Sequence, residues 1–241
     1  MCGRYTLTTV HGRLLAERFE LGEEPEPATL GRFNVCPTEP IAVVTAGGEG
    51  EVEGEGRVVR TLRWGLVPPW ARELGKGFQP INARAETVAA KAPFAELYAR
   101  PERRCLVLAD GWYEWLRPED PRGERVPFRY TVDGGEPFAF AGLWGRRRIG
   151  GELVASAAVL TTRANGVCAP VHDRMPCVLA GPDDEAAWLG GADDPSLLVP
   201  CADERVTAAP ANPAVNRAGV EGPELLEAPR HRQPAQQQLS L

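Results

Sequence analysis

Short apolar segments rich in β-branched and aromatic residues recur along the chain, and they predict a fold made mainly of β-strands. The expected strands cover residues 41–46, 57–65, 104–110, 111–115, 126–133, 137–144 and 153–162. They lack the helix after every strand that characterises a parallel sheet. We therefore expect mixed or antiparallel sheets that curl toward a barrel.

Helical periodicity is limited to three stretches, at residues 8–21, 83–100 (interrupted at Pro93) and 183–189. In the first stretch, Leu14, Leu15 and Phe19 share one face after a threonine cap. With these flanking helices beside many strands, the expected fold class is α+β. Neither a repeat nor a polar linker interrupts the first 220 residues, so a single domain is expected. We place it at 1–228, followed by a disordered Pro- and Gln-rich tail at 229–241.

Composition narrows the class of protein. With 241 residues and 43% hydrophobic side chains, the chain can bury a substantial core. No apolar run approaches the ~18 residues of a membrane span, and the N-terminus lacks a signal-peptide pattern, so we expect a cytoplasmic protein without membrane contact. The six cysteines form no CxxC pair and have no histidine at a zinc-like interval. Neither a metal site nor a disulfide framework is therefore expected.

The net charge of -6 argues against binding a polyanion through bulk charge. Local binding is still open, because all but Lys76 and Lys91 of the 27 basic residues are arginine, whose planar guanidinium suits phosphate oxygens. An arginine-rich codon bias would give the same count. Composition alone therefore neither indicates nor excludes nucleic acid.

The chain opens with MCGRY, which places a cysteine directly after the start methionine. Methionine is normally removed before a small residue such as cysteine, so we expect the mature chain to begin at Cys2. Cys2 would then carry a free α-amine and a thiol on adjacent carbons. No internal cysteine offers that pair, because its nitrogen belongs to a peptide bond.

Three further segments contain candidate chemistry, and each also has a purely structural interpretation. In NARAET (82–87), Asn82 and Arg84 precede an expected helix and could simply cap it. In VHDRMP (171–176), His172 lies beside a carboxylate and an arginine, and could be a buried histidine with satisfied hydrogen bonds.

The third segment is DGWYEW, at 110–115. Strand alternation puts Trp112 and Glu114 on one side, with Tyr113 and Trp115 on the other. A carboxylate among aromatic rings is a candidate for a raised pKa, because desolvation disfavours its charged form. The structural alternative is a glutamate exposed on an edge strand.

Taken together, these segments resemble the SRAP family, the SOS response-associated peptidases understood as abasic-site processing proteins. The resemblance rests on an ordered series of motifs: MCGRY, GRFNVCPT, WGLVPPW, INARAET, RCLVLADGWYEW, LTTRAN, VHDRMPCVL and GPELLEA. It covers nearly the whole chain up to about Ala228. Cys36, Leu108 and Ala71 depart from the residues that the family often has, and PANPAVN (210–216) fits loosely. These departures concern DNA stacking rather than the reaction.

The resemblance implies that Cys2 attaches covalently to abasic sites in single-stranded DNA. The α-amine, with an ordinary pKa near ~7.7 to 8.0, forms an imine with the sugar aldehyde, and the thiol then closes a thiazolidine ring. By the same resemblance, Glu114 transfers protons, His172 is its partner, and Asn82 orients the N-terminal residue or the sugar. No cofactor or metal is implied. Strand cleavage by β-elimination is an expected side activity.

The resemblance also assigns residues to DNA binding. Arg4, Arg84 and Arg174 would hold the phosphates that flank the lesion, and Trp70 would contact a neighbouring base. Thr161, in the LTTRAN motif, is expected at the same surface. We expect the protein to act as a monomer.

Three other functions remain open at this stage. The chain could be a glutamine amidotransferase with an N-terminal nucleophile, although the sequence after MCG lacks the elements expected to bind glutamine. It could be a peptidase that removes Met1 through Cys2, Glu114 and His172. It could also be a reader of DNA lesions that performs no chemistry.

The last residues suggest a protein partner. Gln238, Leu239, Ser240 and Leu241 resemble the Gln-Leu-Ser/Asp-Leu peptide by which bacterial repair proteins bind the replicative sliding clamp. A tail of Gln-rich composition could end this way without that function.

Overall fold

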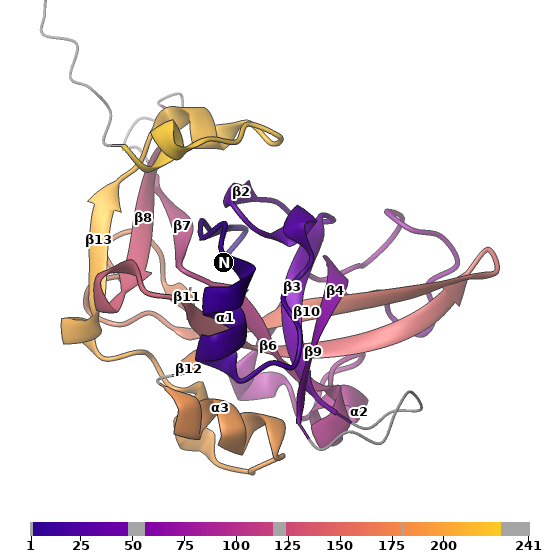
Figure 1. The fold of residues 1–241 in the computed structure, drawn as a ribbon. Helices are drawn as coiled ribbons and strands as arrows, with labels where there is room; N and C mark the ends of the chain where they lie inside the picture. The colour runs from indigo at the N-terminus through magenta and orange to yellow at the C-terminus, as the bar shows by residue number, and fades with distance from the viewer. Residues whose placement is uncertain (1, 48–55, 118–123, 180, 228–241) are drawn as a thin grey trace, which may run out of the picture.

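The computed structural model describes residues 2–47, 56–117, 124–179 and 181–227, which form two adjoining β-sheets with short helices around them (Figure 1). The helices are α1 (Gly12–Phe19), α2 (Ala95–Tyr98) and α3 (Pro182–Leu189), together with short 3₁₀ turns. The strands are β1 (Arg4–Leu7), β2 (Arg32–Val35), β3 (Pro40–Ala46), β4 (Arg57–Trp64), β5 (Asn82–Arg84), β6 (Arg104–Ala109), β7 (Gly111–Leu116), β8 (Val126–Val132), β9 (Phe138–Ile149), β10 (Glu152–Arg163), β11 (Arg174–Pro176), β12 (Val178–Leu179) and β13 (Val206–Pro210).

The larger sheet closes on itself. β4, β3, β6 and β9 pair in that order, and β10 pairs with both β4 and β9, which completes a five-stranded barrel. The pairing of β10 with β4 is parallel and the others are antiparallel, so the sheet is mixed, as expected. β5 and β11 pair with β10 near its C-terminal end. The far ends of β9 and β10 extend away from the body as a hairpin (Figure 1).

The smaller sheet has the strand order β13-β8-β7-β1-β2 and is antiparallel throughout. A buried aromatic group lies between it and the barrel. Tyr5 contacts Trp64 and Phe140 edge-on, and Trp112 stacks on Tyr130 with ring centroids 5.2 Å apart. This shared core fixes the position of β1 and β7 relative to β10, and all three contribute to the site described below.

Most predicted elements are present, and one is wrong. The predicted helix at 83–100 is α-helical only at Ala95–Tyr98, with a 3₁₀ turn at Ala85–Thr87. Residues 82–84 instead form β5, which pairs in parallel with β10. Ala83 is buried in that pairing. Helix propensities differ by only a few tenths of a kcal/mol per residue, so strand hydrogen bonds and burial outweigh them here.

The predicted tail at 229–241, including the Gln238–Leu241 peptide, lies outside the described residues, and so do all four glutamates of residues 46–56. The domain boundary at 228 therefore stays a prediction. No helix within the described part of the chain is long and apolar enough to span a membrane.

Candidate active site

Cys2 lies just before β1, and the pairing of β1 with β7 determines its surroundings. β1 pairs with β7 so that Arg4 faces Tyr113 and Tyr5 faces Trp112. Continuing this register by one residue places Gly3 opposite Glu114. Cys2 is fully buried, and its Sγ lies 3.7 Å from the carbonyl oxygen of Arg4. Burial raises the pKa of the Cys2 thiol far above its ordinary value, and the nearby Glu114 carboxylate raises it further. The thiol is therefore protonated at neutral pH.

A buried carboxylate fixes β1 in this position. Asp110 accepts hydrogen bonds from the Thr6 hydroxyl (2.5 Å) and from the backbone N–H and hydroxyl of Thr8 (2.5 and 2.6 Å). Its remaining charge is compensated by Arg129 at 3.3 Å. Since Asp110 directly precedes β7, this network holds the two strands that carry Cys2 and Glu114 in register.

We expect Asp110→Ala to destabilise the protein by about 3 kcal/mol, because it leaves Arg129 and two threonines without their buried acceptor. The measurement is the free energy of unfolding in urea. Asp133→Ala is the matched control, since Asp133 pairs with Arg205 at the surface, and there the expected loss is about 0–1 kcal/mol. Equal losses for the two variants would contradict the anchoring role of Asp110.

Glu114 lies on a central strand and not on an edge. β7 is flanked by β1 and β8, and Glu114 is 3% exposed. Trp112 belongs to the main core, whereas Tyr113 packs in a separate cluster on the opposite side, so the predicted alternation along this strand is confirmed. Burial raises the pKa of Glu114 to about 7, and Asp173 contributes a smaller rise. Glu114 can therefore both release and accept a proton near neutral pH.

Asn82 and the 168–174 segment reach the site from the barrel. Asn82, on β5, donates a 2.7 Å hydrogen bond from Nδ2 to the carbonyl oxygen of Cys2. Its Oδ1 is buried and has no hydrogen-bond partner among the described residues, so it can accept a hydrogen bond from a bound molecule.

His172 lies just before β11, with its side chain 24% exposed. Its Nδ1 accepts the backbone N–H of Arg174 at 2.9 Å, which assigns the ring proton to Nε2. Burial lowers the pKa of His172, against an opposing effect of Asp173, whose Oδ1 is 3.1 Å from Nδ1. The ring is therefore predominantly neutral at pH 7, and its Nε2–H group is a hydrogen-bond donor.

The residues assigned to DNA binding differ in accessibility. Arg84 and Trp70 are exposed. Thr161 is fully buried, and its hydroxyl donates to the carbonyl oxygen of Ala83 at 3.3 Å, so it joins β10 to β5 and has no surface to offer DNA. Arg174 is also buried: it forms a forked ion pair with Glu86 at 2.7 and 2.9 Å and donates to the carbonyl oxygen of Thr161.

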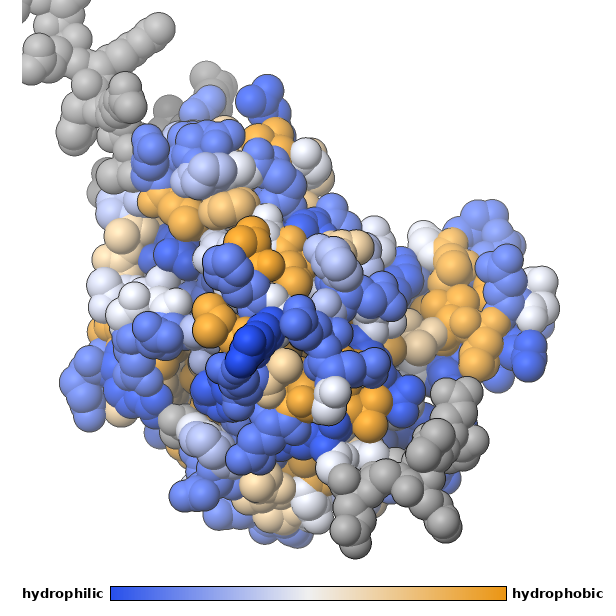
Figure 2. Space-filling model, in the orientation of Figure 1, coloured by the Kyte–Doolittle hydropathy of each residue, from blue (hydrophilic) through white to orange (hydrophobic). Residues whose placement is uncertain are grey.

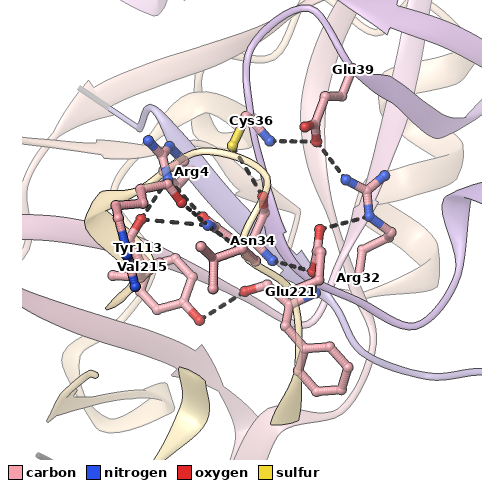
Figure 3. Close-up of polar contacts among 11 residues, drawn as sticks. Arg4, Arg32, Asn34, Cys36, Glu39, Tyr113, Val215 and Glu221 are labelled. Atoms are coloured by element: carbon pink, nitrogen blue, oxygen red, sulfur yellow. Dashed lines mark hydrogen bonds and ion pairs between the residues drawn. The ribbon is translucent and has the colours of Figure 1, made fainter. Parts of the chain in front are cut away.

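Arg4 is half-buried, and its side chain binds Asn34 on β2 and Val215 in the segment after β13 (Figure 3). Its Nη1 donates to Asn34 Oδ1 at 2.8 Å and to the carbonyl oxygen of Val215 at 2.6 Å. Asn34 is fully buried, and its Nδ2 donates at 3.0 Å to the carbonyl oxygens of both Arg217 and Val220. Asn34 thus ties Arg4 to the segment after β13.

A second set of contacts fastens the same segment to β2 (Figure 3). Glu221 accepts the backbone N–H groups of Phe33 and Asn34 at 2.7 and 3.1 Å. Its other oxygen pairs with Arg32, which also binds Glu39. The loosely matching PANPAVN stretch, through Val215, and the residues that follow it up to Glu221 therefore hold Arg4 and β2 in place.

Two surface cavities lie next to neighbours of Cys2, one at Gly3 and one at Asn82. One cavity, of about 490 Å³, is lined by Gly3, Arg4, Trp115, Glu124, Arg125 and Asn216. Another of about the same volume contains Asn82, Arg84, Lys91, Phe78 and Phe94 among its lining residues.

Several residues of this arrangement had no assigned role in the sequence. Asp110, Asn34 and Glu86 lie inside quoted motifs. Asp110 directly follows the apolar run CLVLA, and this was an available signal for that residue. Tyr130, which stacks on Trp112, gave no signal, because a strand tyrosine is usually a core residue. No group of three or more His, Cys, Asp or Glu side chains within the described ranges could hold a metal ion.

Residues 1–218 match the family described as SOS response associated peptidase (SRAP). The chain belongs to this family. Abasic site processing protein YoqW of Bacillus subtilis is 34% identical over 234 residues, which are 94% of this chain and 99% of that protein. Abasic site processing protein HMCES of Xenopus tropicalis is 28% identical, over 81% of this chain and 65% of that protein.

Solved structures show the same fold. A protein from Bacteroides thetaiotaomicron superposes with a TM-score of 0.80 at 21% identity, covering 94% of this chain and 99% of that one. A protein from Bordetella bronchiseptica superposes with a TM-score of 0.70 at 27% identity, covering 88% of this chain and 100% of that one. The SRAP resemblance inferred from the motifs and the expected α+β fold are thus both confirmed.

Proposed function

We propose that this SRAP protein processes abasic sites in DNA by forming a covalent adduct through Cys2. The observation that carries the proposal is the convergence of four groups from distant parts of the chain. Asn82 holds the backbone of Cys2, Glu114 lies beside it with a pKa of about 7, and His172 approaches from the barrel with a neutral ring. The relatives named abasic site processing proteins support the choice of substrate.

The chemistry follows from what Cys2 offers once Met1 is removed. The α-amine adds to the aldehyde of the ring-opened sugar, and loss of one water gives an imine. The thiol then adds to the imine carbon and its proton goes to the nitrogen, which closes a five-membered thiazolidine ring. Because the Cys2 thiol is protonated at neutral pH, attack by the amine comes first, and a base must take the thiol proton at the second step.

Glu114 fits the proton transfers in both steps. As a neutral acid it protonates the leaving hydroxyl during imine formation, and as a carboxylate it takes the thiol proton. A group with a pKa near the working pH performs both roles efficiently. We propose that His172 assists in opening the sugar ring, and that Asn82 keeps the amine of Cys2 directed at the aldehyde.

Finer features of the function belong to the same proposal. We propose removal of Met1 by the protein itself, a side activity of strand cleavage through β-elimination at the imine stage, and preference for single-stranded DNA. Arg84 and Trp70 are accessible for phosphate and base contacts. Arg174 would contribute a phosphate contact only by sharing its guanidinium with Glu86. Docking of Gln238–Leu241 on a sliding clamp remains a proposal from sequence.

A denaturing gel tests the central step. The mature protein is incubated with a single-stranded oligonucleotide that contains an abasic site, and a band shifted by one protein mass that survives heating is expected. An oligonucleotide with a tetrahydrofuran in place of the abasic sugar is the control, because it has no aldehyde. Binding without a shifted band would support a lesion reader, and ammonia release from glutamine would support an amidotransferase.

Salt dependence tests the DNA surface. We expect Arg84→Ala to make the plot of log affinity against log salt shallower by about 0.7, the value for one phosphate contact on a single strand. Affinity for intact single-stranded DNA is measured by fluorescence anisotropy at several salt concentrations. Arg13→Ala is the control, since Arg13 is exposed on α1 and paired with Glu17. An unchanged slope for Arg84→Ala would place the DNA elsewhere.

A further inference from the structure

A cluster of arginines lies at the base of the protruding β9–β10 hairpin, outside the site described above. A hollow of about 170 Å³ there is lined by Arg100, Arg103, Arg146 and Arg147, with Pro68, Pro69 and Pro93 among its apolar residues. We call this the hairpin hollow. Glu96 is the one acidic side chain among its described lining residues. In a protein with a net charge of -6, four arginines around one small hollow are a pronounced local concentration of positive charge.

Two of these charges are uncompensated. Arg100 and Arg147 are exposed, and within the described ranges neither takes part in an ion pair. By contrast, Arg18 and Arg57, on other faces, both pair with the buried Glu185. Arginines that only support the fold usually have such partners. Exposed arginines without partners around a hollow are suited to an external anion.

The segment that carries Arg100 and Arg103 is fixed to β9, the strand that carries Arg146 and Arg147. Trp144, just before the hollow on β9, donates from Nε1 to the carbonyl oxygen of Glu102 at 3.0 Å, and the guanidinium of Arg103 lies 5.0 Å from its ring centroid. β9 and β10 pair continuously from Gly142 to Ile149. The space-filling view shows the hairpin standing out from the body on the right (Figure 2). A projecting, well-paired hairpin can hold an extended ligand with little loss of its own conformational entropy.

Shared lining residues link the hairpin hollow to the candidate active site by way of two further hollows. The cavity that contains Asn82 and Arg84 shares Gly77 and Phe78 with a neighbouring hollow of about 250 Å³ around Trp70. That second hollow shares Pro68 with the hairpin hollow. Both intermediate hollows contain basic residues: Lys91 lines the cavity that contains Asn82, and Arg72 and Lys76 line the hollow around Trp70.

We propose that the hairpin hollow binds the phosphate backbone of the DNA on one side of the lesion, several nucleotides from the abasic sugar. The proposal rests on the proposed function, because it needs DNA to be the ligand of the adjoining site. It adds an anchoring surface, formed by Arg100 and Arg147, to the contacts made beside Cys2. Such a surface gives affinity without reading base sequence.

The test uses the double variant Arg100→Gln/Arg147→Gln and abasic oligonucleotides of three designs. Two carry about 15 nucleotides on one side of the lesion and about three on the other, in either order, near the upper site size of a single-strand groove. In the third, the longer flank is a duplex. At ~50 mM salt, we expect the double variant to bind about five- to tenfold more weakly per lost phosphate contact than the wild type. The plot of log affinity against log salt should be shallower by about 0.7 per contact. Both effects should appear with only one of the two flank orders.

Two controls separate this proposal from the proposed function. On a short abasic oligonucleotide that cannot reach the hairpin, the double variant should form the adduct at the wild-type rate. Arg13→Gln should leave binding to all substrates unchanged. If the double variant binds every substrate as the wild type does, the hairpin hollow is not a DNA site, although crosslinking stands. If the wild type forms no adduct on any substrate, the proposed function fails instead. A loss seen only with the duplex flank would identify double-stranded DNA as the source of the phosphates.

Discussion

Replacing Cys2 by alanine is expected to abolish the heat-stable DNA adduct. The variant keeps an α-amine at the same place, so it can still form an imine, but water hydrolyses an imine readily. It lacks the sulfur that closes the thiazolidine ring. The measurement is the fraction of abasic oligonucleotide that remains shifted on a denaturing gel after heating. Treatment with borohydride, which reduces an imine to a stable amine, should restore a shifted band for the variant.

The matched control is Cys201→Ala, because Cys201 is another buried free cysteine and lies outside the site. It should form the adduct at the wild-type level. A heat-stable band from Cys2→Ala without borohydride would refute the thiazolidine mechanism. Retaining an extra residue before Cys2 should have the same effect as the alanine, since it converts the amine into an amide.

Glu114→Gln is expected to slow adduct formation by ~10² to 10⁴, the usual cost of losing a general acid or base. Glutamine has nearly the shape of glutamate, so the effect isolates the proton. The wild-type rate should change around pH 7, where the buried carboxyl group titrates, and the variant should lose that feature. Single-turnover rates from pH 5 to 9 measure both. Glu136→Gln, at an exposed turn before β9, should behave as wild type.

The same substitution should have an opposite effect on stability. The pKa of Glu114 is raised from 4.5 to about 7 in the folded protein, so its favourable contribution to stability is complete below pH 4.5 and is lost as the pH rises through 7. Glutamine carries no charge to bury at any pH. Glu114→Gln should therefore unfold at higher urea concentration than the wild type at pH 8. Wild-type rates together with unchanged stability would show that Glu114 is not a buried proton-transfer group.

The sequence predicted the long strands, because they depend on local patterns, whereas the candidate site residues came from the resemblance of an ordered series of motifs to the SRAP family. The alternation in DGWYEW placed Trp112 and Glu114 on one side, and β7 follows that pattern. The short strands β1, β2, β5 and β11 were not predicted. Each contains only three or four residues, too few for periodicity, and forms because a longer neighbour supplies its hydrogen bonds.

The partners of the arginines could not be predicted from the sequence either. Arg174 and Glu86 are 88 positions apart, and only the pairing of β10 with both β5 and β11 brings them together. The family resemblance assigned Arg174 to a phosphate contact, whereas its main observed contact is a forked ion pair with Glu86. The burial of Thr161 depends on the same two strands, β5 and β11, which pair with β10 on either side of it. The sequence around LTTRAN did not indicate these strands.

The contacts of Asn34 and Glu221 bear on where this chain can be shortened. The family match ends at residue 218, but the segment that steadies Arg4 continues to Glu221 and to Leu225, whose side chain is fully buried beside Tyr113. A version cut at the end of the family match would lose the carboxylate that caps β2 and expose an apolar pocket. Shortened forms made for crystallisation or for fusion to other proteins should therefore retain the chain through Glu227.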